Sequence, residues 1–204
     1  RLETLLELNQ ITDANLISVG QTLELPAEPN TTSPSSQIIP DDRLVRGPAS
    51  KAFDTIAFVN QQSGYIRTAT DIVEEKLLSA AEVVQRVSQE YGVDARLLLA
   101  ILEYRSKWLT INITDENIKR FPIQGMTSPD GFDRAGLYKQ LAWLANQLNT
   151  GYYGWKYGNL SNLEFDDGTR LKLATELNAA TIGIQRFFSL QRGYSEWEAA
   201  ISTT

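Results

Sequence analysis

The sequence predicts a mainly α-helical protein whose main domain spans residues 51–204. Apolar side chains in this region recur at three- and four-residue spacings, after residues that typically cap helices. The alternation of polar and apolar residues that marks a half-buried strand is scarce there. All four Trp, all eight Tyr and all seven Phe fall in the same region, so it holds the side chains that can build one core of ordinary size.

The first two helices of this domain have clear start and stop signals. Residues 79–82 (Ser-Ala-Ala-Glu) form a capping box, and the apolar pattern that follows ends at Gly92, a natural stop. Asp94 is placed to cap a second helix, from Arg96 to about Lys107. The middle of this second helix is apolar on every side, which predicts that it is buried all round.

Three more helices are predicted further along the chain. Asp133 is expected to cap the third, whose apolar residues lie between Leu137 and Leu148. The fourth is expected over residues 175–190. A second capping box at residues 195–198 (Ser-Glu-Trp-Glu) predicts a short last helix.

The first fifty residues have a different composition. Residues 1–26 combine a short apolar helical pattern with an alternating end that is typical of a strand. Residues 26–50 contain five of the seven prolines and almost no large apolar side chains. We therefore expect an extended Pro/Ser/Thr-rich linker over residues 27–50.

The charge balance and two absent residue types narrow the function. With 19 basic and 25 acidic residues the net charge is −6, which argues against nucleic acid as a partner. The sequence has no His and no Cys, so zinc sites, thiol nucleophiles and Ser-His-Asp triads are excluded. We expect no cofactor and no metal, and any acid–base chemistry has to use carboxylates, Tyr or Lys. No apolar run approaches the roughly 20 residues that a transmembrane helix needs.

Residues 1–26 resemble the C-terminal half of a LysM module. The resemblance rests on a helical pattern that ends at Asn9, a short polar turn, and the later pair Gly20-Gln21 before a strand-like end. Intact LysM modules bind glycans that contain N-acetylglucosamine, such as peptidoglycan or chitin, between two loops, and one of those loops is present here. The resemblance implies glycan contacts from Asn9, Ile11, Thr12, Asp13, Asn15 and Ile17. Alternatively, the same residues form a helix and strand that pack on the main domain.

Residues 79–204 resemble, more distantly, the lysozyme-like fold of lytic transglycosylases. The markers are Tyr-Gly-Val-Asp at 91–94, the buried helix that follows and ends at Trp108, and Gly-Leu-Tyr-Lys-Gln at 136–140. In that family the catalytic Glu occupies the position that is Arg105 in this chain. A guanidinium stays protonated near neutral pH and cannot serve as a general acid. The resemblance therefore implies the fold more strongly than the activity.

Glu103 is the alternative acid. Two residues along a helix turn it by about 200°, so Glu103 and Arg105 are expected on opposite faces. Glu103 could act only after a helix shift or in a different cleft, and we assign no catalytic residue. Loop carboxylates at 115–116 and 166–167 are expected to be solvated or to cap helices.

Four aromatic residues lie between glycines at positions 151–158. Aromatic faces can stack on the apolar faces of sugar rings, which predicts a glycan-binding lip from Tyr152, Tyr153 and Trp155, beside Tyr138. In the alternative interpretation these rings seal the bottom of the helical core. Trp143 falls on an apolar helical pattern and is expected in the core.

The two resemblances, with Arg105 at the acid position, imply an exported bacterial cell-envelope protein that binds peptidoglycan or a related glycan without cleaving it. Because the chain begins at Arg1 rather than Met, we expect further residues upstream. The resemblance to glycan-binding envelope proteins implies a signal peptide among them and an extracellular or envelope location. Two alternatives stay open: an active lytic transglycosylase or muramidase, and a structural subunit of an extracellular assembly with other envelope proteins as partners.

Overall fold

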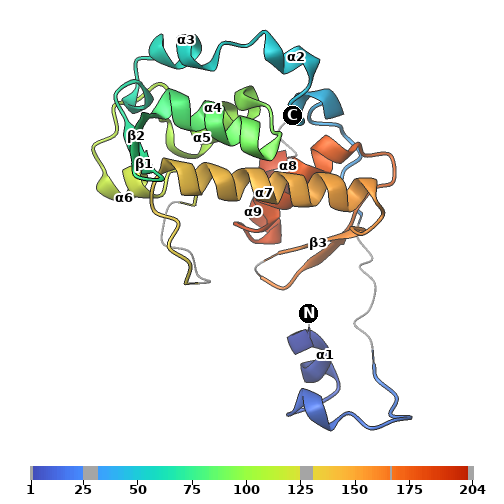
Figure 1. The fold of residues 1–204 in the computed structure, drawn as a ribbon. Coiled ribbons are helices and arrows are strands. Elements are labelled where there is room, and N and C mark those ends of the chain that lie inside the picture. Colours follow the sequence, from blue (N-terminus) through green and yellow to red (C-terminus); the bar gives the residue numbers. More distant parts are fainter. Residues whose placement is uncertain (1, 25–31, 125–130, 166, 202–204) are drawn as a thin grey trace.

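The computed structural model describes residues 2–24, 32–124, 131–165 and 167–201, and the chain is mainly α-helical, as predicted (Figure 1). Two small antiparallel sheets are formed by β1 (Thr70–Val73) with β2 (Lys76–Ser79) and by β3 (Asn162–Glu164) with β4 (Arg170–Lys172). The α-helices are α1 (Leu2–Leu8), α2 (Pro48–Lys51), α3 (Thr55–Asn60), α4 (Ala80–Tyr91), α5 (Ala95–Ser106), α6 (Glu116–Arg120), α7 (Leu137–Lys156), α8 (Ala179–Ser189) and α9 (Tyr194–Ile201). Short 3-10 helices are η1 (Ala14–Leu16), η2 (Asp41–Arg43) and η3 (Tyr65–Arg67).

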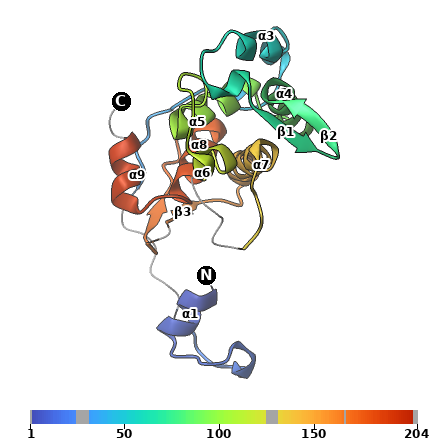
Figure 2. The ribbon, with the colours of Figure 1, turned by 90° about the vertical axis from the view of Figure 1, so that its left-hand side faces the viewer.

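Helix α7 is the centre of the helical domain. It crosses the front of the domain below α4 and α5 in Figure 1, and Figure 2 shows α8 between α7 and α9. The main core gathers around α4, α5 and α7, where Leu98 and Leu144 are fully buried. A second core lies between the β3–β4 sheet, α8 and α9, and contains Trp197. The rings of Trp155 and Phe188 pack against both cores and join them.

Helices α7 and α8 approach each other at two glycines. A Cβ atom added to Gly151 would lie 2.8 Å from the Cα of Gly183, and one added to Gly183 would lie 2.9 Å from the carbonyl oxygen of Leu148. A well-packed interior cannot absorb a methyl group at such distances from backbone atoms. The two helix backbones are therefore in direct contact in the middle of the domain.

Much of the predicted linker is built into the helical domain. Thr32 forms a parallel bridge with Lys172 of β4, and the side chain of Leu44 is fully buried in the main core. The Oδ1 atom of Asp41 accepts a hydrogen bond from the backbone N–H of Ala180 at 2.9 Å, which caps the first turn of α8. These partners lie far along the chain, so local composition did not indicate them. The first part of the predicted linker, residues 27–31, lies outside the described residues.

The start and stop signals of α4 and the start signal of α5 are confirmed. Ser79 and Glu82 form the predicted capping box, and Gly92 ends α4 with φ +65°. The carboxylate of Asp94 accepts a hydrogen bond from the N–H of Arg96 at 2.9 Å and so caps α5.

The predicted cap of α7 is wrong. The residue before α7 is Gly136, and the N–H of Tyr138 donates to Asp71 Oδ2 at 2.8 Å. Asp133 instead accepts a hydrogen bond from the N–H of Ala135 at 3.0 Å. A carboxylate from the β1–β2 hairpin thus accepts a hydrogen bond from a backbone N–H in the first turn of α7. No pattern among neighbouring residues could indicate this partner.

The starts of the last two helices also differ from the prediction. Helix α8 begins at Ala179 rather than near Thr175. Helix α9 begins at Tyr194, so Ser195 lies inside the helix and does not cap it. The N–H of Tyr194 donates to Asp167 Oδ2 at 2.8 Å, again a partner from a distant segment.

The two hairpins were not predicted. In β1–β2, Ile72 lies opposite Leu77, and the turn residues Glu74 and Glu75 have φ +49° and +65°. Tight turns with two positive φ angles usually contain Asn or Gly. The sequence contains no such signal at this turn, which explains why the hairpin was missed.

Residues 2–24 form a small unit of α1 and η1, and none of the side chains described there belongs to either core. The side chain of Asn9 joins the end of α1 to Glu24: its Nδ2 donates to the Glu24 carbonyl at 2.8 Å, and its Oδ1 accepts from the Glu24 N–H at 2.6 Å. A strand was expected over residues 21–25; residue 25 lies outside the described residues, and residues 21–24 pair with no strand among them.

Candidate functional site

Arg105, at the position expected for a catalytic acid, lies in the last turn of α5. Its Nε donates to the backbone carbonyl of Ile123 at 2.8 Å. Burial, with a smaller contribution from the charge of Arg192, lowers the pKa of the Arg105 guanidinium below its usual value. A guanidinium has such a high pKa that it stays charged near neutral pH and cannot donate a proton to a leaving group.

The carboxylate of Glu103, the alternative acid, is engaged elsewhere. Its Oε2 accepts from the N–H of Leu109 at 2.9 Å, and its Oε1 accepts from the hydroxyl of Thr110 at 2.6 Å. These bonds close the turn that follows α5, where Lys107 has φ +58°. Glu103 therefore stabilises a loop, which is a structural role.

Replacing Glu103 by Gln is expected to lower the free energy of unfolding by about 1 kcal/mol, because a charge-assisted hydrogen bond to a loop is weakened. Urea denaturation followed by tryptophan fluorescence measures the change, with the exposed Glu75→Gln variant as control. Release of soluble muropeptides from sacculi should be absent before and after the substitution. A wild-type release activity that Glu103→Gln abolishes would contradict this assignment.

The other carboxylates considered for catalysis also bind backbone groups. Asp115 accepts from the N–H of Asn117 at 2.7 Å and caps α6. Asp167 accepts from the N–H groups of Thr169 and Tyr194, and these bonds hold its pKa below the ordinary value. Asp166 lies outside the described residues. Among the described residues, no group of three or more Asp or Glu side chains is arranged to hold a metal ion.

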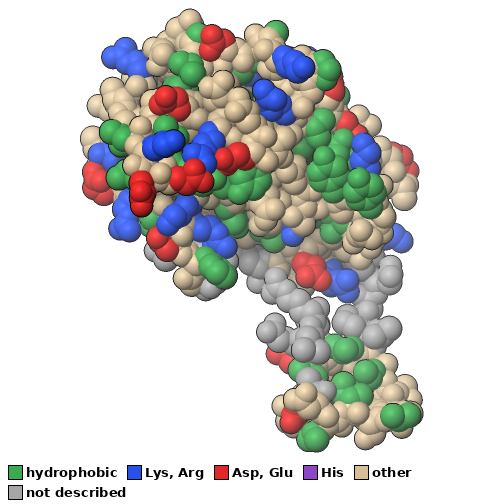
Figure 3. Space-filling model, in the orientation of Figure 1, with side chains coloured by type: hydrophobic (Ala, Val, Ile, Leu, Met, Phe, Trp, Pro, Cys, Tyr) green, Lys and Arg blue, Asp and Glu red, His purple; other side chains and the backbone are tan. Residues whose placement is uncertain are grey.

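A line of side chains on the outer face of α7 offers a binding surface. Its members recur at three- and four-residue spacings, so they lie above one another along the helix. Figure 3 shows hydrophobic side chains gathered over the C-terminal end of α7 and charged side chains of both signs over the opposite end. This outer stripe consists of Lys139, Trp143, Asn146, Thr150 and Tyr153 of α7 and of Tyr157, the residue that directly follows the helix; all are exposed except Trp143, which is half-buried.

The N-terminal half of the outer stripe borders a groove of about 560 Å³. The guanidinium of Arg134 lies 5.3 Å from the ring of Phe132 and 5.9 Å from the ring of Trp143, so it bridges the two rings. Lys139 pairs with Asp133 at 2.9 Å on the rim. Aromatic faces beside a few polar groups are typical of sites for small polar ligands with apolar faces.

Tyr138, which the sequence indicated as a candidate glycan contact, lines the same groove, and its hydroxyl is held in place. It donates to Glu90 Oε2 at 2.8 Å, while the guanidinium of Arg86 lies 5.6 Å from the tyrosine ring. Burial and the bond to Glu90 raise the pKa of Tyr138 to about 12. Hydrogen bonds from Arg86 and Tyr138 lower the pKa of Glu90. The phenol is thus neutral and fixed at physiological pH.

Of the four aromatic residues between positions 151 and 158, two lie on the surface and two pack into the core. Tyr153 and Tyr157 are 42% and 70% exposed, and their rings stack with centroids 5.9 Å apart. Tyr152 is buried, and Trp155 is half-buried with its Nε1 donating to the carbonyl of Leu177 at 3.0 Å. Tyr152 and Trp155 belong to the core, so of the predicted lip residues Tyr153 alone lies on the outer stripe.

The N-terminal residues with predicted glycan contacts lie in the separate unit of residues 2–24. The side chain of Asn9 is occupied by the backbone of Leu5 and Glu24. Asp13 caps η1 by accepting from the backbone N–H and the side chain of Asn15. Thr12, Asp13, Asn15 and Ile17 are exposed, and Ile11 is half-buried. The structure brings none of these residues to the outer stripe of α7.

Phe132 and Trp143 line the groove but were not among the candidate site residues that the sequence indicated. Trp143 was expected in the core, but one side of its ring faces the groove. The sequence did contain a signal for an aromatic surface, because Trp143, Tyr153 and Tyr157 recur at helical spacing with polar residues between them. If this spacing is followed past the glycines at 151 and 154, it indicates an exposed aromatic face on the helix.

Among the described residues, none of the helices combines the length and the apolar character that crossing a bilayer requires. Residues 37–203 match the family model described as LasA, N-terminal domain. No curated protein and no solved structure matches the chain. The match begins before Leu44, so it includes most of the N-terminal segment that packs into the helical domain.

Proposed function

The chain belongs to the LasA N-terminal domain family, and we propose that it acts as a non-catalytic domain that binds peptidoglycan or a related N-acetylglucosamine glycan. The proposal places the protein in the envelope or outside a bacterial cell, where such glycans are found. The observation that carries it is the outer stripe of α7, an exposed line of aromatic and polar side chains on a rigid helix.

The aromatic groups of the outer stripe are spaced for an extended ligand. Trp143, beside the groove, and Tyr153, in the stacked pair, are ten residues apart, which is about 15 Å along the helix axis at 1.5 Å per residue. Asn146 and Thr150 lie between them and offer hydrogen-bonding groups. A glycan chain along α7 can therefore stack sugar faces at both ends and hydrogen-bond in the middle.

The N-terminal unit supplies a second, weaker argument for glycan binding. The side chains of Thr12, Asn15 and Ile17 are exposed, and the loop that holds them is shaped by the Asp13 cap. Polar groups beside an exposed aliphatic side chain suit a sugar with an acetamido group. This unit then adds contacts to those of α7, so that two modest sites act together.

The non-catalytic part of the proposal is supported by the carboxylates, which are engaged in hydrogen bonds and ion pairs within the protein. Retaining and inverting glycosidases usually need two carboxyl groups that flank the scissile bond. Here Glu103 binds a loop, Asp115 caps a helix and Arg105 stands at the expected acid position. No pair of free carboxylates faces the groove beside α7 in the described part of the chain, because Asp133, the one Asp or Glu on its lining, pairs with Lys139.

Replacing Tyr153 and Tyr157 together by Ala is expected to weaken binding to sacculi by about tenfold, because exposed aromatic anchors contribute much of the affinity at such surfaces. Pull-down with purified sacculi at several protein concentrations measures the change. Phe58→Ala, which removes an exposed ring from α3, is the matched control and should bind as wild type does. Trp143→Ala should also weaken binding, with thermal unfolding measured to exclude loss of the fold.

Two outcomes would contradict the proposal. Equal binding by wild type, the double tyrosine variant and the Trp143 variant would exclude the outer stripe as the glycan site. Steady release of soluble muropeptides by the wild type would instead favour an active transglycosylase or muramidase.

A further inference from the structure

Strand β3 has an open side. In the described part of the chain it pairs with β4 alone, and Thr32 bridges to β4 on the other side of the sheet. The carbonyl of Ser161 accepts from Leu173 at 2.9 Å, and the N–H of Phe165 donates to the carbonyl of Thr169 at 3.0 Å, so both groups point toward β4. Because antiparallel pairing alternates along a strand, the N–H and C=O of Asn162 point away from β4.

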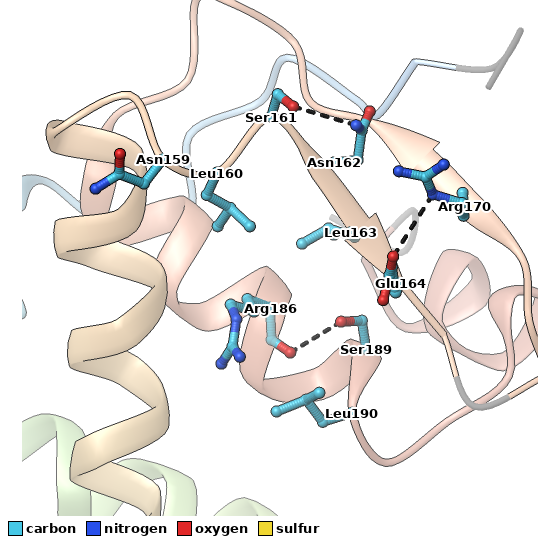
Figure 4. Close-up of a pocket in the computed structure, with 10 residues that line it drawn as sticks. All are labelled: Asn159, Leu160, Ser161, Asn162, Leu163, Glu164, Arg170, Arg186, Ser189 and Leu190. Atoms are coloured by element: carbon cyan, nitrogen blue, oxygen red, sulfur yellow. Dashed lines mark hydrogen bonds and ion pairs between the residues drawn. The ribbon is translucent and has the colours of Figure 1, made fainter. Parts of the chain in front are cut away.

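A cavity of about 360 Å³ lies between β3 and the last turn of α8 (Figure 4). Residues 159–164 line one side of it, and Arg186, Ser189 and Leu190 line the other. An open strand edge beside a cavity is the arrangement by which sheets take up an additional strand from a peptide.

The charged groups at this cavity favour an acidic ligand. Two arginines, Arg170 and Arg186, and one carboxylate, Glu164, line it. The hydrogen bonds of the Arg186 guanidinium go to the backbone and side-chain oxygens of Gln147, which are neutral groups, and burial lowers the pKa of Arg186. A half-buried guanidinium without a carboxylate partner is costly and is stabilised by an incoming anion.

Besides Arg186, whose hydrogen bonds are made to neutral groups, the cavity has two polar atoms that lack hydrogen bonds. Asn162 Oδ1 is buried without a hydrogen-bond donor. Arg170 Nε forms an ion pair with Glu164 Oε1 at 3.6 Å but is buried without a hydrogen-bond acceptor (Figure 4). Buried polar atoms are nearly always hydrogen-bonded in folded proteins, so unpartnered ones beside a cavity suggest a ligand that completes them. A peptide offers both the N–H and the C=O groups that these atoms require.

We propose that this cavity binds an extended peptide segment with one acidic side chain. The peptide backbone pairs with Asn162 along the open edge of β3, and the acidic side chain forms an ion pair with Arg186. A simple carboxylic acid would satisfy Arg186 but would leave the strand edge and Asn162 Oδ1 without partners. The proposal is independent of glycan binding, since it uses residues of β3, β4 and α8 and none of the outer stripe of α7.

The test uses pools of capped, fluorescein-labelled hexapeptides with random uncharged side chains and one fixed Glu. Fluorescence anisotropy with the whole 204-residue chain should show saturable binding. A matched pool with Gln in place of Glu should bind at least about tenfold more weakly, because a charge-assisted hydrogen bond is lost. A third pool, N-methylated at alternate residues, should lose binding, because it cannot pair with a strand edge. A soluble chitin oligosaccharide should not compete with the peptides.

Protein variants locate the binding site. Arg186→Gln is expected to reduce binding of the Glu pool to the level of the Gln pool, and Arg170→Gln provides a second test if the first variant unfolds. Arg43→Gln, an exposed arginine in η2, is the matched control. In NMR spectra the backbone amide of Asn162 should shift on peptide addition. Equal binding of the Glu and Gln pools, full binding of the N-methylated pool, or unchanged binding by a folded Arg186→Gln variant would overturn the proposal.

Discussion

Replacing Gly183 by Val is expected to destabilise the helical domain by about 3 kcal/mol, at the upper end of what overpacking usually costs. The new Cβ would lie 2.9 Å from the carbonyl oxygen of Leu148 and equally close to a methyl carbon of Leu44. The carbonyl belongs to the backbone of α7 and cannot turn aside, so α7 and α8 must move apart. Urea denaturation followed by tryptophan fluorescence measures the loss.

Gly47→Val is the control for this prediction, because no heavy atom lies within 4 Å of a Cβ at Gly47 and its φ angle suits any residue. Its effect should stay within about 0.5 kcal/mol. Equal losses in the two variants would show that the contact between α7 and α8 is looser than described. A rise in the free energy of unfolding of the Gly183→Val variant would likewise show that α7 and α8 are less tightly packed than described.

Deleting residues 1–46 is expected to prevent the helical domain from folding, whereas deleting residues 1–31 leaves it folded. The longer deletion removes the fully buried Leu44 and the Asp41 cap of α8. It also removes the hydrogen bond from the N–H of Arg46 to the carbonyl of Gly92. Loss of one buried leucine costs about 2–5 kcal/mol and a lost buried hydrogen bond about 1–3 kcal/mol, which together approach the whole stability of a typical domain.

Far-ultraviolet circular dichroism and thermal unfolding of the two truncated chains check this prediction. A cooperative unfolding transition after the longer deletion would show that residues 32–46 are dispensable, as the linker interpretation requires. Unfolding after the shorter deletion would instead show that the helical domain depends on the N-terminal unit.

The sequence was sufficient for those elements whose signals are local. Ser79, Glu82 and Gly92 mark the limits of α4, and Asp94 marks the start of α5; the structure confirms each of them. Wherever a cap comes from a distant segment, as Asp71 does for α7, a window of neighbouring residues could not reveal it. The proline-rich composition of residues 26–50 predicted a linker, and it gave no indication of the contacts that residues 32–46 make with distant parts of the chain.

The candidate site was predictable in part for the same reason. Tyr153 was indicated as a candidate by the cluster of aromatic residues between glycines, and Tyr138 by the Gly-Leu-Tyr-Lys-Gln segment that resembles a lytic transglycosylase motif. Whether a ring on α7 faces the core or solvent depends on how α4 and α8 pack against that helix. Tyr152 and Tyr153 are adjacent in sequence, yet one is buried and the other is exposed. Only the packing of neighbouring helices separates them.

The two rings shared by both cores affect how the domain unfolds. Trp155 and Phe188 each pack against both hydrophobic clusters, so opening the smaller cluster around Trp197 also exposes side chains of the larger one. Regions linked in this way tend to open as a single cooperative unit rather than one after the other. In native-state hydrogen exchange, the slowest amides of α8 and α7 should therefore report the same opening free energy.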